Sequence, residues 1–481
     1  MFIKLKQLQL QLIFVIFCSY SAVMAIELPE MGSSANTVLS PAEERILGEA
    51  FIRQLRLQIE VLDDSQINNY INALGNRLVS YSDTPEQTFH FFVVNESSIN
   101  AFAVPGGYIG LHSGLILNTR SEDELASVIA HEIAHITQRH IARTLEAAQR
   151  FSLPSVAALI AAMVVGINNP QVGQAAATAV MAGNAQLQIN FTRKHEQEAD
   201  RLGMQLLAQA GFEPASMPAF FQRLLTATRY YQGTVPEFLQ THPVTSDRIA
   251  EAQDRANDYP QKPHVDSPLY HLMRAKLLVL TTDNHKNLIK KLEDMLADKR
   301  YRDERATRYA LALALLADQQ TKAVETQINW LLKHDEKRVI YQLLKAQLAW
   351  ANQQPEQALE IYQQTLEIYP RDSSLILDYA DKLLQHQKPE QAKIVLAKIS
   401  AAKNPEYYRL LAQAHQKTDN PAEARLALTE HYYLKGQTQL ALEQLKQARQ
   451  LDDLDFYLTT RIEARYRALE AELMEEEHQD E

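Results

Sequence analysis

Hydrophobic residues recur with the spacing of an α-helix along most of the chain. In residues 40–82 the apolar positions, among them Phe51, Leu55 and Ile71, follow this repeat and predict helices that begin near Ser40. From about residue 267 onward the same spacing continues in segments rich in Ala, Leu, Gln and Glu. The chain is therefore predicted to be mainly α-helical.

Two extended segments interrupt the helical pattern. Residues 89–94 form an apolar, aromatic run, and residues 101–109 contain the turn signal Pro105-Gly106-Gly107. We expect a strand followed by a hairpin, and hence a small β-sheet among helices. An exposed edge of this hairpin could hold an extended peptide through main-chain hydrogen bonds, although a purely structural hairpin has the same pattern.

A longer helix is predicted over residues 121–148. Ser121 and Glu124 suit a capping box at its start, and the acidic side chains of the first turn would interact favourably with the positive end of the helix dipole. The apolar positions that would face the core are Leu125, Val128, Ile129 and Ile136.

The second half of the chain contains internal repeats. Ala323, Ala358 and Ala392 occupy matching positions that are 35 and 34 residues apart, the period of tetratricopeptide repeats. Small residues there let paired helices pack closely, and stacked pairs leave a concave groove that usually binds protein. The spacing predicts an all-α tetratricopeptide-repeat solenoid of about four to six repeats.

The segment 151–192 contains no charged side chain. Its continuously apolar part, residues 156–165, is shorter than the roughly 20 residues of a membrane-spanning helix, and Asn168, Asn169 and Pro170 interrupt it. One interpretation is a buried helical hairpin. The others are a mobile lid over a cleft, or a surface over 153–180 that makes peripheral contact with a membrane or with unfolded polypeptide.

Length and charge narrow the possible functions. A chain of 481 residues that is 46% hydrophobic can bury sizeable cores and should contain two or more domains. The formal net charge of −11 and the acidic run at residues 475–477 argue against nucleic-acid binding. The end of the chain is expected to be a solvated acidic tail.

The first 25 residues have the pattern of a secretion signal. Two lysines precede an apolar run over residues 8–20, and residues 23–25 suit a cleavage site, so the mature protein would begin at Ile26. An uncleaved anchor is the alternative, but the run is short for a membrane span. Cleavage would remove Cys18, the only cysteine, so the secreted protein would have no disulfide.

An HExxH motif occupies residues 131–135 within the predicted helix. One turn separates His131 from His135, so their imidazoles share a face and can converge on one ion, with Glu132 beside the same cleft. This is half of a zinc hydrolase site. A third ligand must come from elsewhere, because catalytic zinc usually has three protein ligands and an open fourth position.

A second cluster of candidate ligands lies about 60 residues downstream, in a segment that should be helical until Gly211. Glu196 could be the third ligand, and Asp200, one turn on, could accept the second N–H of a ligating histidine and fix its tautomer. A solvated, charged helix face is the alternative. His140 is one residue out of register for the pattern HExxHxxGxxH, so we expect it on the helix surface.

These motifs together resemble a known family. The sequences HEIAH and EQEAD, with NAFAVPGG at 100–107 and Thr-His-Pro at 241–243, resemble the gluzincin peptidases that include HtpX and the CaaX prenyl protease. The resemblance covers about residues 40–255 and implies an α+β zincin-type metalloprotease domain with a small β-sheet. It implies one zinc ion per chain, with these site residues: His131, His135 and Glu196 as ligands and Glu132 as the catalytic carboxylate.

The same resemblance draws attention to His242 and Arg248. His242 could polarise the scissile carbonyl and steady the oxyanion, or it could occupy the open zinc position and keep the enzyme latent. Arg248 could orient this loop or a carboxylate. A structural role for both residues is the remaining alternative.

With a predicted secretion signal in front and repeats behind, the chain is similar to periplasmic members of this family that act in outer-membrane protein quality control. The implied order is a signal peptide (1–25), a zinc metallopeptidase domain (26–262), a tetratricopeptide-repeat domain (263–470) and an acidic tail (471–481). The implied enzyme is a periplasmic zinc endopeptidase that degrades misassembled outer-membrane β-barrel proteins and also assists their assembly. The repeats would bind the outer-membrane β-barrel assembly machinery.

A different class of function is a chaperone or assembly adaptor that acts through its repeats and has a latent metal site. The complete ligand set beside Glu132 favours the enzyme, because an adaptor needs no base next to zinc.

Overall fold

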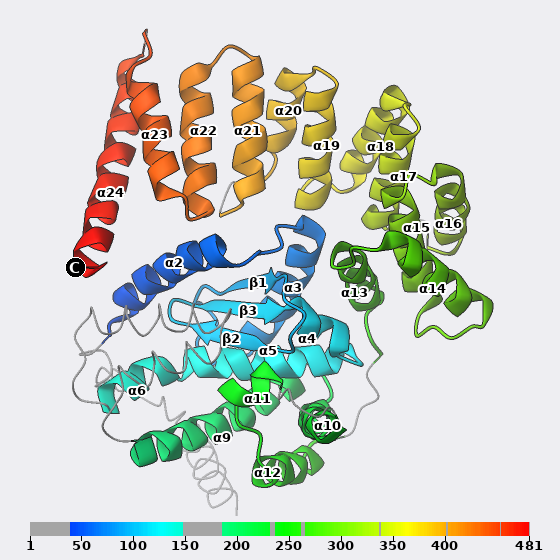
Figure 1. Cartoon of the computed structure of the whole chain (residues 1–481), viewed down its shortest axis with the longest axis vertical. Coiled ribbons are helices and arrows are strands. Elements are labelled where there is room, and N and C mark those ends of the chain that lie inside the picture. The colour runs from blue at the N-terminus through cyan, green and yellow to red at the C-terminus, as the bar shows by residue number, and fades with distance from the viewer. Residues whose placement is uncertain are drawn as a thin grey trace, which may run out of the picture.

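The computed structural model describes residues 39–147, 185–230, 236–260, 265–335, 338–400, 403–452 and 454–480. These residues are mainly helical and contain one three-stranded sheet, as the sequence predicts (Figure 1). The predicted signal peptide, and residues 151–184 with the expected membrane contact at 153–180, lie outside the described residues. None of the helices in the described ranges is long and apolar enough to cross a membrane.

The first part of the described chain surrounds the sheet with helices. The helices predicted over 40–82 are the first two, and they begin at well-formed caps: the Ser40 hydroxyl accepts from the Glu43 amide, and the Asp64 carboxylate accepts from the amides of Gln66 and Ile67. The elements are α2 (Pro41–Gln58), α3 (Ser65–Val79), β1 (His90–Val94), β2 (Ala101–Val104), β3 (Tyr108–His112), α4 (Ser113–Asn118), α5 (Glu122–Thr137), α6 (His140–Ala147), α9 (Ala185–Gln209), α10 (Ser216–Tyr230), α11 (Glu237–Thr241) and α12 (Ser246–Asn257).

The sheet has the strand order β1-β3-β2. β1 runs parallel to β3, from the pair His90 and Tyr108 onward, and β2 and β3 form the predicted antiparallel hairpin. The hairpin turn needs glycine, because Gly106 and Gly107 have φ values of 81° and 86° and a Cβ on Gly107 would lie 2.2 Å from the Thr88 carbonyl oxygen. Because β2 is the last strand in the order β1-β3-β2, it is an edge strand of this sheet.

α5 packs against β2 and is buried along almost its whole length. Its predicted core positions are all buried: Leu125, Val128, Ile129 and Ile136. The predicted extension of this helix to residue 148 is wrong. The helix ends after Thr137 because Arg139 takes a left-handed conformation, with a φ of 51°. In this conformation the Arg139 guanidinium lies 3.0 Å from the Glu44 carboxylate of α2, and a new helix, α6, begins at His140.

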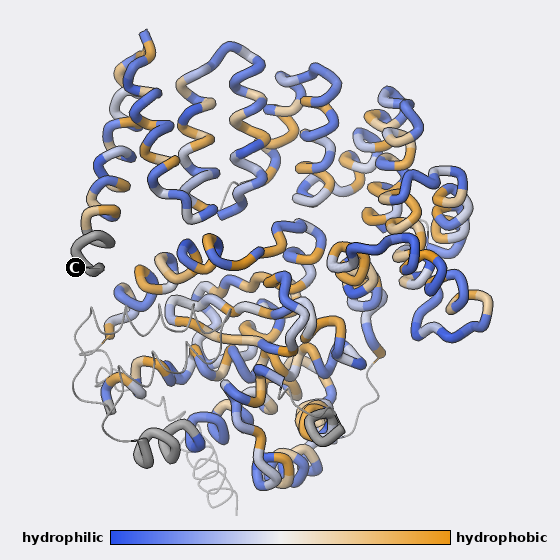
Figure 2. Tube along the Cα trace, viewed as in Figure 1, coloured by the Kyte–Doolittle hydropathy of each residue, from blue (hydrophilic) through white to orange (hydrophobic). Residues whose placement is uncertain are grey.

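The remaining helices form the solenoid. Gln319, Gln353 and Gln387, with φ values of 60°, 61° and 56°, turn the chain between paired helices and are spaced by 34 residues, which accounts for the repeat period. Ala358 and Ala392, each five residues after its glutamine, are fully buried within their pairs. In the preceding pair this position is taken by the fully buried Val324, so the predicted match of Ala323 is wrong by one residue. Figure 2 shows hydrophobic and hydrophilic residues alternating along these helices, as expected when each buries one face. The bounds are α13 (Pro268–Leu280), α14 (His285–Ala297), α15 (Glu304–Ala317), α16 (Thr321–His334), α17 (Val339–Ala351), α18 (Pro355–Ile368), α19 (Ser373–Gln385), α20 (Pro389–Leu396), α21 (Pro405–Lys417), α22 (Pro421–Leu434), α23 (Thr438–Arg449) and α24 (Phe456–Asp480).

Both ends of the solenoid contact the first part of the chain (Figure 1). α13 packs on α3 and α4, and its N-terminus is joined to that of α5: the buried Glu122 carboxylate accepts from the Ser267 hydroxyl at 2.7 Å and from the Tyr70 hydroxyl at 2.9 Å. At the other end, Arg53 of α2 donates to the Tyr433 hydroxyl at 2.9 Å and pairs with Glu472 of α24. The solenoid thus arches over α2 and α3.

A cavity of 540 Å³ lies between the two parts of the chain. It is lined by side chains of α2, α3 and the sheet on one side and of α21 and α22 on the other. The predicted domain boundary at 262/263 falls within residues 261–264, which the structure does not describe, and it stays a prediction. One buried core cluster continues across this boundary, since it includes both Ala256 and Tyr270.

Candidate metal centre

The two motif histidines and Glu196 are brought together by two helices that cross at close range. α5 carries His131 and His135, and α9 carries Glu196. At the crossing α9 has Gly203, where a Cβ would lie 3.0 Å from the backbone nitrogen of His131. A side chain at this position would push the helices apart, so the glycine allows the carboxylate to reach both imidazoles.

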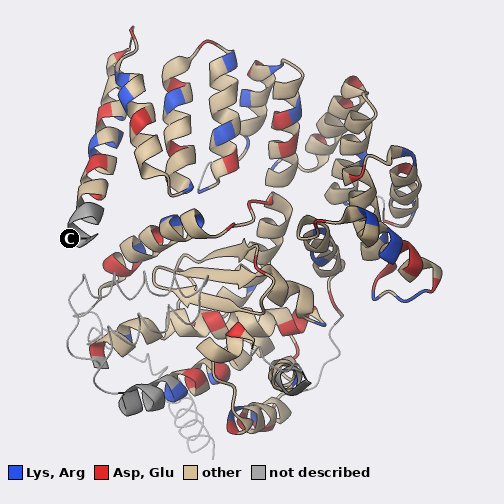
Figure 3. Ribbon diagram, in the orientation of Figure 1, with Lys and Arg blue, Asp and Glu red and all other residues tan. Residues whose placement is uncertain are grey.

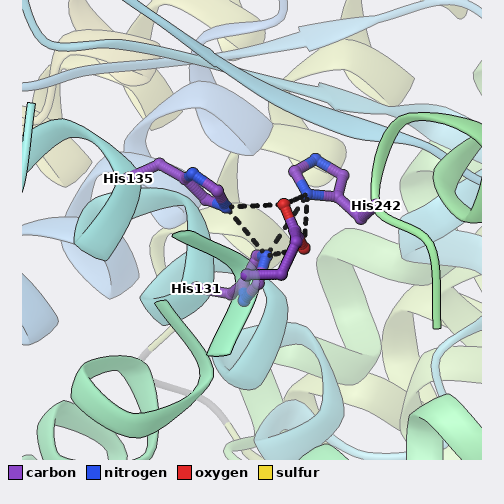
Figure 4. A group of neighbouring side chains, drawn as sticks. His131, His135 and His242 are labelled. Carbon is purple, nitrogen blue, oxygen red and sulfur yellow. Dashed lines mark hydrogen bonds and ion pairs between the residues drawn. The ribbon is translucent and has the colours of Figure 1, made fainter. Parts of the chain in front are cut away.

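Four side chains direct ligand atoms toward one point (Figure 4). The Nε2 atoms of His131 and His135 are 3.1 Å apart, and each lies 3.4 Å from a carboxylate oxygen of Glu196. His242 Nδ1 is 3.3 Å from His131 Nε2 and 3.1 Å from Glu196 Oε1. All four ligand atoms fall within 4.8 Å of one another. Imidazole nitrogens and a carboxylate around one centre are the ligands that zinc prefers.

A buried ionic chain lies behind His131. Its Nδ1 atom, on the far side of the ring, is 3.0 Å from Asp200 Oδ1. Arg248 donates to both Asp200 oxygens at 2.8 Å and lies 3.0 Å from Glu196 Oε2. Its third contact, at 2.9 Å, is the Pro243 carbonyl next to His242. Asp200 thus holds the His131 ring, and Arg248 orients both carboxylates and the His242 loop.

His140 lies behind His135 rather than on the helix surface, so that prediction is wrong. Only 3% of His140 is exposed, and its Nδ1 atom is 2.8 Å from His135 Nδ1. The break at Arg139 turns α6 back toward the site, which a continuous helix would not do. Burial and the neighbouring His195 lower the pKa of His140 to about 4. The other nitrogen faces Glu198 at 3.2 Å.

Glu132 is fully buried beside the cluster. Among the described residues, neither of its carboxylate oxygens has a side-chain hydrogen-bond partner, and the His242 imidazole approaches it, with Nε2 3.5 Å from Oε1. Burial raises the pKa of Glu132, and it outweighs the opposing effect of His242 and His131. A carboxylate in such surroundings takes up a proton more readily than an exposed one.

The ionisable groups of the cluster influence one another strongly. Burial disfavours the protonated imidazole of His131, but Asp200 and Glu196 outweigh this effect and raise its pKa to about 10. Burial keeps the pKa of His135 well below its ordinary value. Burial also opposes ionisation of Glu196, yet His242 and His135 hold its pKa well below the usual range. Figure 3 shows acidic residues on α5 and α9, the two helices that carry the motif histidines and Glu196.

The sequence singled out seven residues for this site, and the structure brings them together: Glu132, His131, His135, Glu196, Asp200, His242 and Arg248. It adds His140 and Glu198, which helical spacing could not identify because the break at Arg139 depends on a contact with α2.

This fold and this set of ligand atoms are those of a metallopeptidase. Residues 65–256 match Peptidase family M48, and residues 349–414 match the tetratricopeptide repeat. The chain is 37% identical to the putative beta-barrel assembly-enhancing protease of Vibrio cholerae, over 92% of this chain and 91% of that protein. It is 34% identical to the beta-barrel assembly-enhancing protease of Escherichia coli, over 91% and 90%.

A more distant similarity covers the peptidase part alone. The mitochondrial metalloendopeptidase OMA1 of Schizosaccharomyces pombe is 29% identical over 38% of this chain and 52% of that protein. The chain belongs to the family of beta-barrel assembly-enhancing proteases, within peptidase family M48. The predicted enzyme class, the mainly α architecture and the predicted family resemblance are confirmed.

The substitution Arg248→Met tests the ionic chain. It leaves Asp200 and Glu196 buried without their guanidinium partner, so we expect the free energy of unfolding in urea, at a fixed zinc concentration, to fall by about 3–5 kcal/mol. Arg201→Met is the matched control, because Arg201 is exposed on α9 directly after Asp200. Equal unfolding midpoints for the two variants would contradict the structural role of Arg248.

Proposed function

We propose that this protein is a periplasmic zinc-dependent endopeptidase that degrades misassembled outer-membrane β-barrel proteins and also assists their assembly. The observation that carries the proposal is the convergence of His131, His135 and Glu196 beside the buried Glu132. The names of the relatives support the substrate class, because the alignment extends over both parts of the chain. The predicted secretion signal at residues 1–25 supports the periplasm.

One zinc ion per chain would be held by the Nε2 atoms of His131 and His135 and a carboxylate oxygen of Glu196. Zinc in such a site lowers the pKa of coordinated water and polarises a substrate carbonyl. Asp200, 3.0 Å from His131 Nδ1, keeps the proton on that nitrogen and so leaves the Nε2 lone pair directed into the site. Arg248 balances the charge of Asp200 and orients Glu196.

Glu132 is the catalytic base and acid. It accepts the proton of the attacking water and returns it to the leaving nitrogen of the peptide. Two features of its surroundings support this role: the carboxylate lies beside the ligand cluster, with Oε1 3.5 Å from His242 Nε2, and burial raises the pKa of the carboxyl, so it takes up a proton more readily.

The edge strand β2 is the natural platform for the substrate. It packs on α5, and the backbone of Ala103 in this strand lies near enough to Glu132 to influence its pKa. An extended peptide that pairs with this edge would pass the cluster and be held by main-chain hydrogen bonds, largely independently of its side chains. Such binding suits a protease of unfolded or misassembled proteins.

His242 acts as a reversible latch. Its Nδ1 atom approaches the same point as the three ligands, so it stands where a fourth ligand would bind, and α11 holds it there through the contact between the Phe238 amide and the Ile99 carbonyl at 3.0 Å. Release of this loop would open the position to substrate. The competing role, support of the oxyanion, is favoured by the 3.5 Å approach of His242 Nε2 to Glu132.

The repeats select partners. The 540 Å³ cavity between α21, α22 and the sheet combines aromatic and charged side chains such as Tyr408, Tyr433 and Lys403, a mixture suited to exposed polypeptide. The assembly machinery of outer-membrane β-barrels is the expected partner. The alternative function, an assembly adaptor with a latent metal site, is supported by the position of His242 among the ligands.

The substitution Glu132→Gln tests the enzyme. It removes the base but no ligand, so we expect wild-type zinc content and a loss of cleavage of unfolded protein by at least about 1,000-fold, within the usual range for removal of a general base. Cleavage at the native rate would contradict the role of Glu132. Full restoration of β-barrel assembly in cells by this variant would favour the adaptor.

The substitution His242→Ala tests the latch. Removal of the fourth ligand frees a position for water, so basal cleavage of unfolded protein should rise several-fold with zinc retained, as measured by fluorogenic casein and metal analysis. Loss of cleavage with zinc retained would instead assign His242 to transition-state stabilisation.

A further inference from the structure

The two motif histidines each have a partner at Nδ1, the nitrogen that faces away from the cluster. For His131 this partner is Asp200, which the sequence predicted. For His135 it is His140, whose Nδ1 atom lies 2.8 Å from His135 Nδ1. The two rings meet edge to face, with centroids 4.8 Å apart and an interplanar angle of 81°. The 2.8 Å between the two nitrogens is within the usual range of donor–acceptor distances for a hydrogen bond.

A hydrogen bond between two ring nitrogens requires one donor and one acceptor. If His135 binds a metal ion through Nε2, its neutral ring must carry the proton on Nδ1, and His135 is the donor. His140 Nδ1 must then be the acceptor, so the proton of the His140 ring is on Nε2. That nitrogen faces Glu198 Oε2 at 3.2 Å, and a carboxylate is an acceptor. Only one assignment of tautomers satisfies both contacts.

The surroundings hold His140 in this orientation. Arg143, one turn later on α6, donates to Glu198 Oε2 at 2.8 Å and fixes the carboxylate. The His140 ring stacks on His195 with centroids 4.1 Å apart and an interplanar angle of 8°. The positive φ of Arg139 starts α6 at the angle that brings His140 behind His135. The chain from His135 through His140 and Glu198 to Arg143 thus matches the chain from His131 through Asp200 to Arg248.

We propose that His140 is a positioning residue of the metal centre: its Nδ1 atom accepts a hydrogen bond from the Nδ1–H of His135 and so presents the Nε2 lone pair of that histidine to zinc. The inference rests on the proposed function, because it takes His135 as a ligand. An outer hydrogen-bond partner of this kind typically accounts for about 10–100-fold in metal affinity. A histidine in this place differs from a carboxylate in that it adds no charge to the cluster.

The test is the zinc affinity of the full chain, measured by chelator competition at pH 7. His140→Phe keeps a stacking ring against His195 but removes both nitrogens, and we expect it to bind zinc about 10–100-fold more weakly. His140→Asn places an amide oxygen near the position of Nδ1 and should recover most of this loss. His415→Phe, which replaces a half-buried histidine of α21, is the control and should bind zinc as wild type does.

Wild-type zinc affinity in His140→Phe, or equal weakness in His140→Phe and His140→Asn, would overturn the inference. A measurement on the wild type does not depend on folding of the variants: ¹⁵N shifts of the histidine rings in the zinc-loaded protein should place the proton of His140 on Nε2, and a proton on Nδ1 overturns the inference. His135→Ala tests the proposed function separately. Weak zinc binding by His135→Ala together with native affinity in His140→Phe would contradict only the role of His140.

Discussion

The arrangement of the site depends on one guanidinium. Arg248, only 4% exposed, contacts both oxygens of Asp200, one oxygen of Glu196 and the carbonyl of Pro243. Two carboxylates buried together would otherwise repel each other and take up protons. Arg248 offsets part of this negative charge, and the histidines of the cluster hold the pKa of Glu196 well below its usual range, so α9 can present it as an ionised ligand. The same guanidinium fixes Asp200 against the His131 ring and the loop that carries His242 beside the cluster.

The solenoid is continuous with the catalytic part rather than a separate appendage. The Glu122 carboxylate, at the start of the helix that carries the HExxH motif, accepts hydrogen bonds from the cap of the first solenoid helix at Ser267. The far end returns to α2 through Arg53 and its partners. A polypeptide bound in the cavity between these parts would contact the sheet on whose edge strand we propose substrate binding. The cavity is lined by residues of β1 and β3, and the proposed substrate strand β2 pairs with β3 at the opposite edge of the same sheet.

The sequence predicted the parts of this protein that depend on local spacing. The HExxH helix, the hairpin at Gly106 and Gly107 and the repeat period all follow from residue patterns that set φ, burial or helical register. It also pointed to Glu196, Asp200, His242 and Arg248, because motif spacing and the family resemblance single out these positions. The convergence itself depends on Gly203, which looks like any helical glycine until the crossing with α5 is seen.

Long-range contacts account for what the sequence did not predict. The end of α5 at Thr137 is set by a contact between Arg139 and α2, and the positions of His140 and Glu198 follow from that break. No local pattern distinguishes such a histidine from a surface one. The same holds for the contacts of Lys403 with Tyr108 and of Arg53 with Tyr433, which join residues about 300 and 380 positions apart.

We propose that side chains of α5, α9 and the His242 loop hold one zinc ion. X-ray absorption spectroscopy of the zinc-loaded wild type and of His242→Ala tests it most directly. We predict one zinc per chain with three imidazoles and one carboxylate oxygen in the wild type, and two imidazoles in the variant. Zinc without imidazole ligands, or several zinc ions per chain, would contradict the proposed metal centre. An identical ligand set in both proteins would contradict the latch.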